Sequence, residues 1–182
     1  MKFNKTILVS FFLIIVLSFP CQGANNFWGV DESVQLWISG GVNDCFTGSL
    51  GFRRDNFGLE VGCCFNSEIS KNDFLDYPCP HGYYTVIGNK RVGNTLGIDL
   101  LYFYSPNNYI FSVYGGIGVY AEGQSEIVRS NATGWLYRNG CDSKFYFPFS
   151  VGIKYLFDKK YEMGLGYHTL RGFNVQFSLV VK

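Results

Sequence analysis

The sequence lacks an excess of either charge and is poor in charged residues of both signs. Its 182 residues include 15 Lys and Arg against 14 Asp and Glu, for a formal net charge of +1, and charged side chains make up 16% of the chain. A protein that holds a polyanion needs a basic surface field. The charge balance therefore argues against nucleic acid as a partner.

Long apolar runs are also missing, apart from one at the N-terminus. Two lysines precede an uncharged apolar stretch at residues 7–19, and small residues follow it up to Ala24. A membrane-spanning helix needs roughly 18 apolar residues or more, and this stretch is shorter. The pattern is typical of a secretory signal peptide. We predict that residues 1–24 are cleaved and that residues 25–182 form one exported domain; the alternatives are a retained anchor helix and a lipidated Cys21.

The spacings that usually bind metals are absent. No CxxC pair occurs, and the two histidines, His81 and His168, lie far apart. We therefore predict no metal site and no cofactor. Five cysteines remain after cleavage, well below the density of a disulfide-stapled miniprotein, and the odd number leaves at least one thiol unpaired or intermolecular. They are Cys45, Cys63, Cys64, Cys79 and Cys141.

Glycine and aromatic residues, in contrast, are abundant. The chain has 22 Gly and 19% aromatic residues, whereas ordinary glycine usage is about 7%. Glycine disfavours helices, while Phe, Tyr and Val suit a pleated surface and glycine suits turns and crowded interiors. The composition predicts an all-β protein.

Apolar residues alternate with small or polar ones in segments separated by turn signals, which is the period-two pattern of β-strands. In the last segment, for example, every second residue from Phe173 to Val181 is apolar. The eight predicted strands are 34–41, 46–53, 57–65, 95–104, 111–120, 145–157, 161–168 and 173–181.

Every second connection between these strands is tight. Residues 55–56, 105–108 and 158–160 have strong turn chemistry. They alternate with looser links, two of which are long, at residues 66–91 and 122–143. This order predicts an up-and-down antiparallel β-barrel with both termini and all three tight turns at one end.

The two faces of the strands differ in side-chain size. One face is dominated by Phe, Tyr, Leu, Ile and Val, and the other carries glycines and charges. The members of the second face are Gly58, Gly62, Gly97, Gly116, Gly118, Gly152, Gly164 and Gly166, with Glu60, Asp99, Lys154 and Glu162 among them. An eight-stranded barrel has an interior just wide enough for side chains. We therefore predict an eight-stranded antiparallel up-and-down transmembrane β-barrel whose bulky face meets lipid. The alternative is a soluble exported lipocalin-like barrel that binds a small apolar ligand.

The inward face predicts a closed lumen and a charge network. The large inward side chains are Leu101, Phe103, Tyr114, Tyr120 and Tyr146. Lys154 and Glu162 flank a tight turn, so an antiparallel register places them opposed or diagonal within cross-strand reach. Glu60 and Asp99 lie at comparable depth on neighbouring strands.

Aromatic residues cluster beside two of the tight turns, as an interfacial girdle does. They are Tyr102, Tyr104, Tyr109, Tyr155, Phe157 and Tyr161.

The stretches 56–62, 162–168 and 171–176 resemble the strand and turn signatures of the small eight-stranded outer-membrane barrels of Gram-negative bacteria, the OmpA/OmpX-like or "porin family" barrels. One departure is the C-terminus, Val180-Val181-Lys182, where that family usually has an aromatic residue that assists insertion. The resemblance implies a cell outer membrane location, a monomer with membrane lipid as its surroundings, and function through extracellular loops.

No catalytic group emerges from the sequence. A lipid A deacylase of this fold would carry a His-x-Ser pair near the C-terminal strands, but His168 is followed by Thr169 and Leu170. The glycines of 115–118 lie inside a predicted strand and open no helix, so they are not a phosphate loop. The sequon at Asn131-Ala132-Thr133 is interpreted as a polar loop. We predict that the protein is not an enzyme.

The two long links are the predicted functional regions. Loops of more than twenty residues are usually functional or disordered, and these two contain aromatic residues, among them Tyr83 and Trp135. Each also carries one cysteine. We predict that the links pack together into an aromatic cap for an extracellular or host ligand, with a Cys79–Cys141 disulfide as one hypothesis and Cys45 as the competing thiol. The roles that remain open are adhesion, envelope integrity and host interaction.

Overall fold

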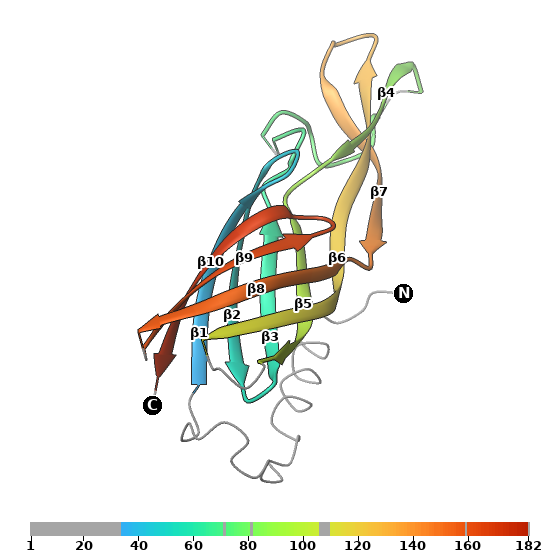
Figure 1. The fold of residues 1–182 in the computed structure, drawn as a ribbon. Coiled ribbons are helices and arrows are strands. Elements are labelled where there is room, and N and C mark those ends of the chain that lie inside the picture. Colours follow the sequence, from blue (N-terminus) through green and yellow to red (C-terminus); the bar gives the residue numbers. More distant parts are fainter. Residues whose placement is uncertain (1–33, 71, 81, 106–109, 159, 182) are drawn as a thin grey trace. The chain divides into compact units, whose positions relative to one another are not determined.

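The eight predicted strands close into one antiparallel barrel in the computed structural model, which describes residues 34–181 apart from 71, 81, 106–109 and 159 (Figure 1). The barrel strands are β1 (Val34–Val42), β2 (Phe46–Arg54), β3 (Phe57–Cys64), β5 (Thr95–Tyr104), β6 (Phe111–Ser130), β8 (Phe149–Asp158), β9 (Tyr161–His168) and β10 (Gly172–Val181). Pairing of β1 with β10, from Val34 opposite Val181 to Val42 opposite Phe173, closes the barrel. The predicted fold class, an all-β, eight-stranded, up-and-down antiparallel barrel, is confirmed.

The N-terminal prediction falls on a part of the chain that is not described. Residues 1–24, the predicted signal peptide, and the proposed cleavage point lie outside the described residues. Within the described part, no helix is long and apolar enough to span a membrane.

The tight connections gather at one end of the barrel, as predicted. Asp55 and Asn56 form the turn between β2 and β3, and Asp55 has a φ of 55°, a left-handed conformation that Asp tolerates better than most residues. Arg54, beside this turn, pairs with Val34, which in turn pairs with Val181. The first and last described strands therefore begin and end at the tight-turn end.

The opposite end of the barrel carries two strands that were predicted to be loops. β4 (Tyr84–Arg91) and β7 (Leu136–Tyr146) pair antiparallel with the outer half of β6. β6 continues for 20 residues, to Ser130, and with β4 and β7 projects beyond the barrel (Figure 1). The expectation of two irregular links at 66–91 and 122–143 was wrong for these segments. The outer half of β6 is rich in polar residues, so it shows no apolar alternation that would identify a strand.

The predicted strand 145–157 is interrupted. β7 ends at Tyr146, opposite Tyr120, and β8 begins at Phe149, opposite Ile117, so the register is the same on both sides of the break. Pro148 lies in the gap, and a proline has no N–H to give to the ladder. Its carbonyl still accepts a hydrogen bond from the Gly118 amide at 2.9 Å. Together, β7 and β8 act as one long strand whose hydrogen-bond ladder is interrupted at the proline.

Aromatic side chains and glycines fit together inside the barrel. Trp37, Leu101, Phe103 and Tyr114 form a buried cluster. The backbone of Gly97 lies so close to the Tyr120 ring that a Cβ atom on residue 97 would overlap it, and Gly166 has the same relation to Tyr114. The glycines on the inward face therefore make room for the large rings, because the eight-stranded interior has space only for side chains.

Candidate functional site

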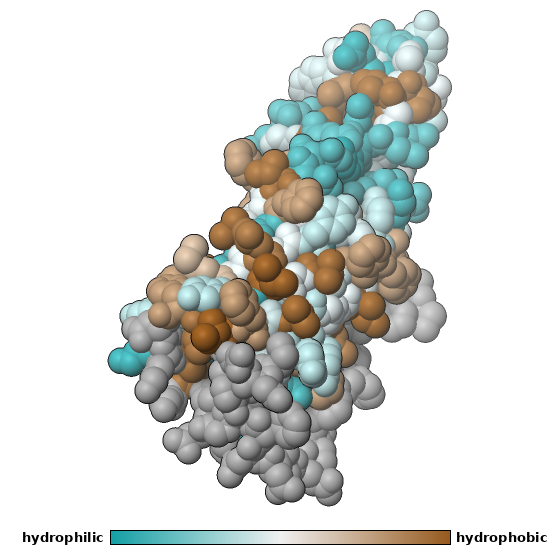
Figure 2. Space-filling model, viewed as in Figure 1, coloured by the Kyte–Doolittle hydropathy of each residue, from teal (hydrophilic) through white to brown (hydrophobic). Residues whose placement is uncertain are grey.

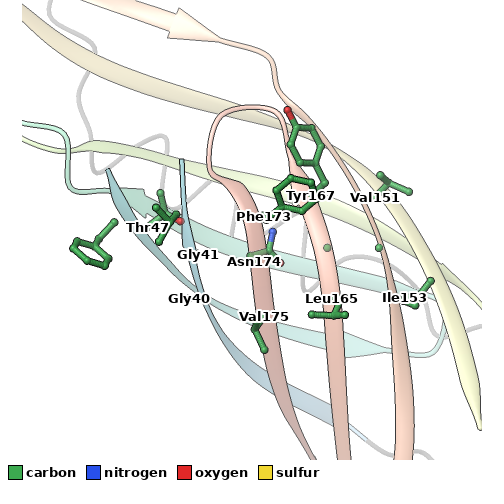
Figure 3. Close-up of a pocket in the computed structure, with 14 residues that line it drawn as sticks. Gly40, Gly41, Thr47, Val151, Ile153, Leu165, Tyr167, Phe173, Asn174 and Val175 are labelled. Atoms are coloured by element: carbon green, nitrogen blue, oxygen red, sulfur yellow. The ribbon is translucent and has the colours of Figure 1, made fainter. Parts of the chain in front are cut away.

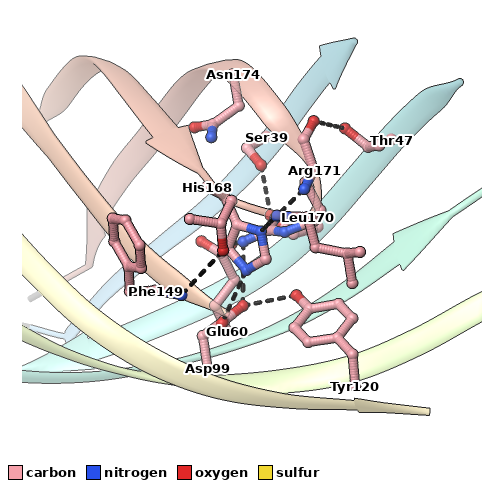
Figure 4. Close-up of polar contacts among 12 residues, drawn as sticks. Ser39, Thr47, Glu60, Asp99, Tyr120, Phe149, His168, Leu170, Arg171 and Asn174 are labelled. Atoms are coloured by element: carbon pink, nitrogen blue, oxygen red, sulfur yellow. Dashed lines mark hydrogen bonds and ion pairs between the residues drawn. The ribbon is translucent and has the colours of Figure 1, made fainter. Parts of the chain in front are cut away.

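The half of the lumen nearer the projecting sheet holds a charge network centred on Arg171. Glu60 of β3 and Asp99 of β5 are directly opposed, and the Arg171 guanidinium from the β9–β10 turn donates to both carboxylates, with an Nη2–Oδ2 distance of 3.1 Å to Asp99. The arginine is 2% exposed and the two acids no more than 1%. Trp37 Nε1 donates to Glu60 at 2.6 Å, and the Tyr120 hydroxyl donates to Asp99 at 2.6 Å. Figure 4 shows Glu60, Asp99, Tyr120 and Arg171 converging on one another.

His168 is part of the same network. Its Nδ1 accepts hydrogen bonds from the backbone amides of Leu170 and Arg171, at 3.1 and 3.0 Å. Because Nδ1 is an acceptor, the ring proton lies on Nε2, which donates to Asp99 Oδ1 at 3.0 Å. Thr169 Oγ1 accepts from the Phe149 amide at 3.1 Å. Both ring nitrogens are thus engaged in holding the β9–β10 turn, which agrees with a lumenal histidine and leaves no nitrogen to activate a nucleophile.

A second cation, Lys154, lies in the half of the lumen nearer the tight turns. Lys154 Nζ donates to Ser178 Oγ at 3.1 Å and lies 3.9 Å from the centroid of the Trp37 ring. Lys154 is opposite Gly164, and Glu162 is opposite Leu156, so Lys154 and Glu162 are diagonal neighbours. Glu162 Oε1 accepts instead from Gln35 Nε2 at 3.2 Å. The predicted diagonal placement is confirmed, but their direct ion pair is not formed, since the ammonium turns toward Trp37 and Ser178.

The structure places most of the predicted inward groups as expected and adds one that sequence reasoning missed. Leu101, Phe103, Tyr114 and Tyr120 are buried in the barrel. Tyr146 was expected to fill the lumen, but it is half-buried at the end of β7, where its hydroxyl donates to Glu122. No inward role is predicted for Arg171. The signal that could have found it is the pair of opposed carboxylates, because two buried acids at one depth need a cation.

The two predicted long links do pack against each other. Leu75 in the first link forms an isolated β-bridge with Tyr137 of β7. The Leu75 amide donates to the Leu136 carbonyl at 2.9 Å, and the Leu75 carbonyl accepts from the Arg138 amide at 3.0 Å. Arg138 also forms an ion pair with Asp76 at 2.6 Å. The links and the β4–β6–β7 sheet therefore form one structured projection, as the packing prediction required.

An ion pair ties the start of the first link to β4. Arg91 Nε donates to Glu68 Oε1 at 2.7 Å, and Lys90 Nζ lies 3.9 Å from the same carboxylate. The hydrogen bond from Arg91 is the main cause that lowers the pKa of Glu68 below its ordinary value, and the same bond raises the pKa of Arg91. Both side chains are about a third exposed, so solvent weakens the pair.

The predicted disulfide between Cys79 and Cys141 is not formed. All five cysteines after residue 24 are free, and Cys141 is exposed on β7. Cys141 pairs across the ladder with Ser125 of β6, while the first link contacts β7 at Leu75. The β-ladder and the Leu75 bridge hold the two links together in place of a covalent bond.

The outer face of the barrel is apolar and aromatic. At the tight-turn end, Phe57 packs edge-on against Tyr102, Phe111 packs at a tilt against Tyr155, and Phe157 stacks on Tyr161. The described members of the predicted girdle are exposed as expected, and Tyr109 lies outside the described residues. The opposite rim carries a second set of exposed aromatic residues: Phe46, Phe65, Phe145, Phe147, Phe149 and Phe173. Two aromatic rings around an apolar band are typical of barrels that cross a membrane.

An apolar depression of about 830 Å³ lies on this outer face, near the second aromatic rim. Residues of five strands line it; the outward side chains include Val151, Leu165 and Val175, with Tyr167 and Phe173 at one end (Figure 3). Gly40 opens its floor, because a Cβ atom there would meet nothing within 4 Å. The depression belongs to the apolar band and not to the lumen.

Comparisons with known proteins find weak likenesses, all of them to solved structures. No protein-family model and no curated protein matches the sequence. Solved structures similar to it include the N-terminal β-barrel domain of OprF from Pseudomonas aeruginosa, at 12% identity and a TM-score of 0.44 over 83% of this chain and 98% of that one. Ail, the attachment invasion locus protein of Yersinia pestis, matches at 11% identity and a TM-score of 0.44 over 83% and 97%. Neisserial surface protein A matches at 9% identity and a TM-score of 0.38 over 81% and 90%.

Likenesses this weak carry no conclusion about function. The barrel topology itself, eight antiparallel strands with a polar lumen and an apolar exterior, is that of the small OmpA/OmpX-like barrels to which the sequence showed a resemblance.

Proposed function

We propose that this protein is a monomeric bacterial outer-membrane β-barrel that has no enzymatic activity and binds a partner outside the cell through its projecting β4–β6–β7 sheet. The outer face supports the location. Most large residues that point outward from the barrel are at least one third exposed, and hydrophilic residues become dominant only where the strands leave the barrel (Figure 2). Such a surface is stable when lipid covers it.

The observation that carries the binding role is an aromatic tip on the projecting sheet. Trp135, in the turn between β6 and β7, is 61% exposed, and Tyr83, just before β4, is 70% exposed. Both are attached by their backbone to the end of β6, where the Ser130 amide donates to the Trp135 carbonyl and the Asn131 amide donates to the Tyr83 carbonyl. Exposed Val86 on β4 extends the patch. Exposed aromatic groups on an ordered scaffold are typical of binding surfaces.

The length of β6 supports the view that this tip stands clear of the membrane. Its 20 residues extend over roughly 66 Å at about 3.3 Å per residue, whereas a tilted strand needs about 9 to 11 residues to cross a bilayer. Only the part up to Ala121 pairs with β5 or β8 in the barrel. The polar remainder, which carries the tip, lies on the side away from the tight turns and fits an extracellular position.

A soluble lipocalin-like barrel is the competing function, and the lumen argues against it. The space that would hold an apolar ligand is occupied by Lys154, Arg171 and their polar partners. Cell fractionation separates the two directly. The proposal expects the protein in the outer-membrane fraction, released only by detergent. A freely soluble periplasmic or secreted monomer would overturn it.

The binding role is tested by shortening the projection along its own register. Gly123 and Ser143 are paired, so an Asn-Gly turn between them removes the outer half of β6 and most of β7, with Trp135, and keeps the barrel ladder. The matched point variant is Trp135→Ala with Tyr83→Ala, and Phe147→Ala, an exposed aromatic at the barrel rim, is the control. We expect bacteria that display the shortened or tip-substituted protein to lose adherence to cultured epithelial cells and immobilised matrix proteins, with serum survival and detergent resistance measured in parallel. Full activity of the shortened barrel in all these assays would place the function elsewhere.

A further inference from the structure

A polar cavity of about 330 Å³ lies at the mouth of the barrel, below the projecting sheet. Three connections and several strand ends contribute to its wall. The residues include Asp44 between β1 and β2, Glu68 after β3, Arg91 at the end of β4, Glu122 in β6, Tyr146 at the end of β7, and Leu170 between β9 and β10. Its volume is at the lower end of the range for small-molecule sites.

The wall carries a buried carboxylate whose hydrogen-bond partners are all neutral. Glu122 is 3% exposed. Its Oε1 accepts from Gln124 Nε2 at 2.9 Å and from the Tyr146 hydroxyl at 3.3 Å, and its Oε2 lies 3.3 Å from Thr95 Oγ1 and 3.5 Å from Asn66 Nδ2. All four partners are neutral, and three of the contacts are long for a carboxylate, which prefers about 2.7–2.9 Å to a charged donor.

The cations nearby form their ion pairs and ring contacts with other groups, although the charge of Arg91, in the same wall, also acts on Glu122. Arg91 and Lys90 approach Glu68. Lys144 lies directly across the ladder from Glu122, but its ammonium lies over the Tyr146 ring, 4.9 Å from the centroid. Within the described residues, Glu122 thus forms no ion pair. A buried charge is normally paired, and here the cavity itself is the place where a counter-charge fits.

We propose that this cavity binds a small organic cation, a primary amine or guanidinium, whose charge pairs with Glu122, with Asp44 on the facing loop as a weaker second contact. An organic cation fits better than a metal ion, because the described residues form no group of three His, Cys, Asp or Glu side chains that could hold one. Leu170 and Phe65 add apolar wall for a carbon chain. The site lies at the barrel mouth and not at the aromatic tip. It is therefore a separate proposal from partner binding, and the two are tested independently.

Calorimetry on the full mature barrel in detergent micelles tests the site with two cationic probes. Putrescine represents a free amine, and acetyl-Gly-Arg-Gly-amide represents a basic side chain of a partner protein. We expect at least one probe to bind with one-to-one stoichiometry and the uncharged analogue 1,4-butanediol not to bind. Glu122→Gln should weaken binding by about tenfold or more, since it removes the buried charge and keeps the shape. Asp142→Asn, the same charge change at an exposed site on β7, should leave affinity unchanged.

Two further variants keep the test informative if Glu122→Gln does not fold. Asp44→Asn lies in an exposed loop and should weaken binding about threefold, whereas Lys144→Met removes a competing positive charge and should strengthen it about threefold. Binding of putrescine alone identifies a free amine, and binding of the peptide alone identifies a partner's side chain. The proposal would be overturned if neither probe bound. It would also be overturned if the Glu122 and Asp44 variants bound the probes as tightly as the parent protein, or if the parent bound calcium chloride more tightly than either probe.

Discussion

Glu60 on β3 and Asp99 on β5 face each other across the ladder, and one guanidinium, that of Arg171, binds both carboxylates. The arginine comes from the turn between β9 and β10, on the far side of the closing β1–β10 pair. A single side chain therefore links β3 and β5 to the last hairpin through the lumen. Removing a partner from such a buried group leaves uncompensated charge.

Arg171→Met is expected to lower the free energy of unfolding by about 3–5 kcal/mol, because two buried carboxylates lose their shared cation. Adding Glu60→Gln and Asp99→Asn should recover much of the loss. Urea unfolding in phospholipid vesicles measures both changes. Arg129→Met, at an exposed position on the outer half of β6, is the control. An equal loss in the single and triple variants would show that the charges are not coupled.

Lys154→Met and Glu162→Gln should show non-additive effects, although the two side chains do not bond directly. They are diagonal neighbours in a poorly hydrated lumen, and coupled groups of this kind typically interact by about 0.5–3 kcal/mol. The double variant should therefore be more stable than the sum of the single losses predicts. A double-mutant cycle from the same unfolding assay decides this, and strictly additive losses would refute the coupling.

Gly97→Ala should destabilise the barrel by about 1–3 kcal/mol, the usual cost of overpacking. The new methyl group would overlap the Tyr120 ring and approach the Val119 carbonyl oxygen. Gly40→Ala is the matched control, because its methyl group would point outward into open space; it should leave stability unchanged or slightly raised. Thermal unfolding of the two variants beside the parent gives the comparison. Equal effects at both glycines would mean that the lumen is not tightly filled.

The lumen should not conduct solutes. Tyr114, Tyr120 and Phe103 are buried across it, and the Arg171 network joins strands from both sides. An eight-stranded barrel leaves space only for such side chains. Planar bilayers with the purified monomer should show no sustained large conductance. Reproducible openings of porin size would contradict this expectation.

The Glu68–Arg91 pair should survive mild acid. Because the folded pKa of Glu68 lies below its ordinary value of 4.5, the pair contributes fully above that value and is lost as the pH falls through the lower, folded pKa. Carbon NMR shifts of the Glu68 carboxyl should therefore titrate below pH 4.5. Glu68→Gln should increase amide exchange at the Glu68 and Ile69 amides, which donate to the Arg91 carbonyl, and high salt should do the same in the parent. A titration at or above the ordinary value would mean that the pair is absent.

The sequence by itself determined the barrel. Period-two alternation assigns each strand residue to one face, and the contrast between glycine with charges on one face and bulky apolar groups on the other decides which face is inside. Alternating tight and long connections then determine the order of the strands. These signals are local, so the eight barrel strands, the inward position of Glu60, Asp99 and Lys154, and the exposed girdle residues could all be predicted.

Only the tertiary structure decided what lies between and beyond those strands. Arg171 lies in a turn, where the alternation of side chains assigns no face. Its side chain points into the lumen because it binds Glu60 and Asp99, which lie far away in the sequence. The outer half of β6 has no apolar period because it projects beyond the apolar band, and its strand character comes from pairing with β4 and β7. The mouth cavity has the same origin, since its wall combines residues of connections and strand ends that lie far apart in the sequence. Such contacts between distant segments leave no periodic signal in the chain, so they appear only when the barrel closes.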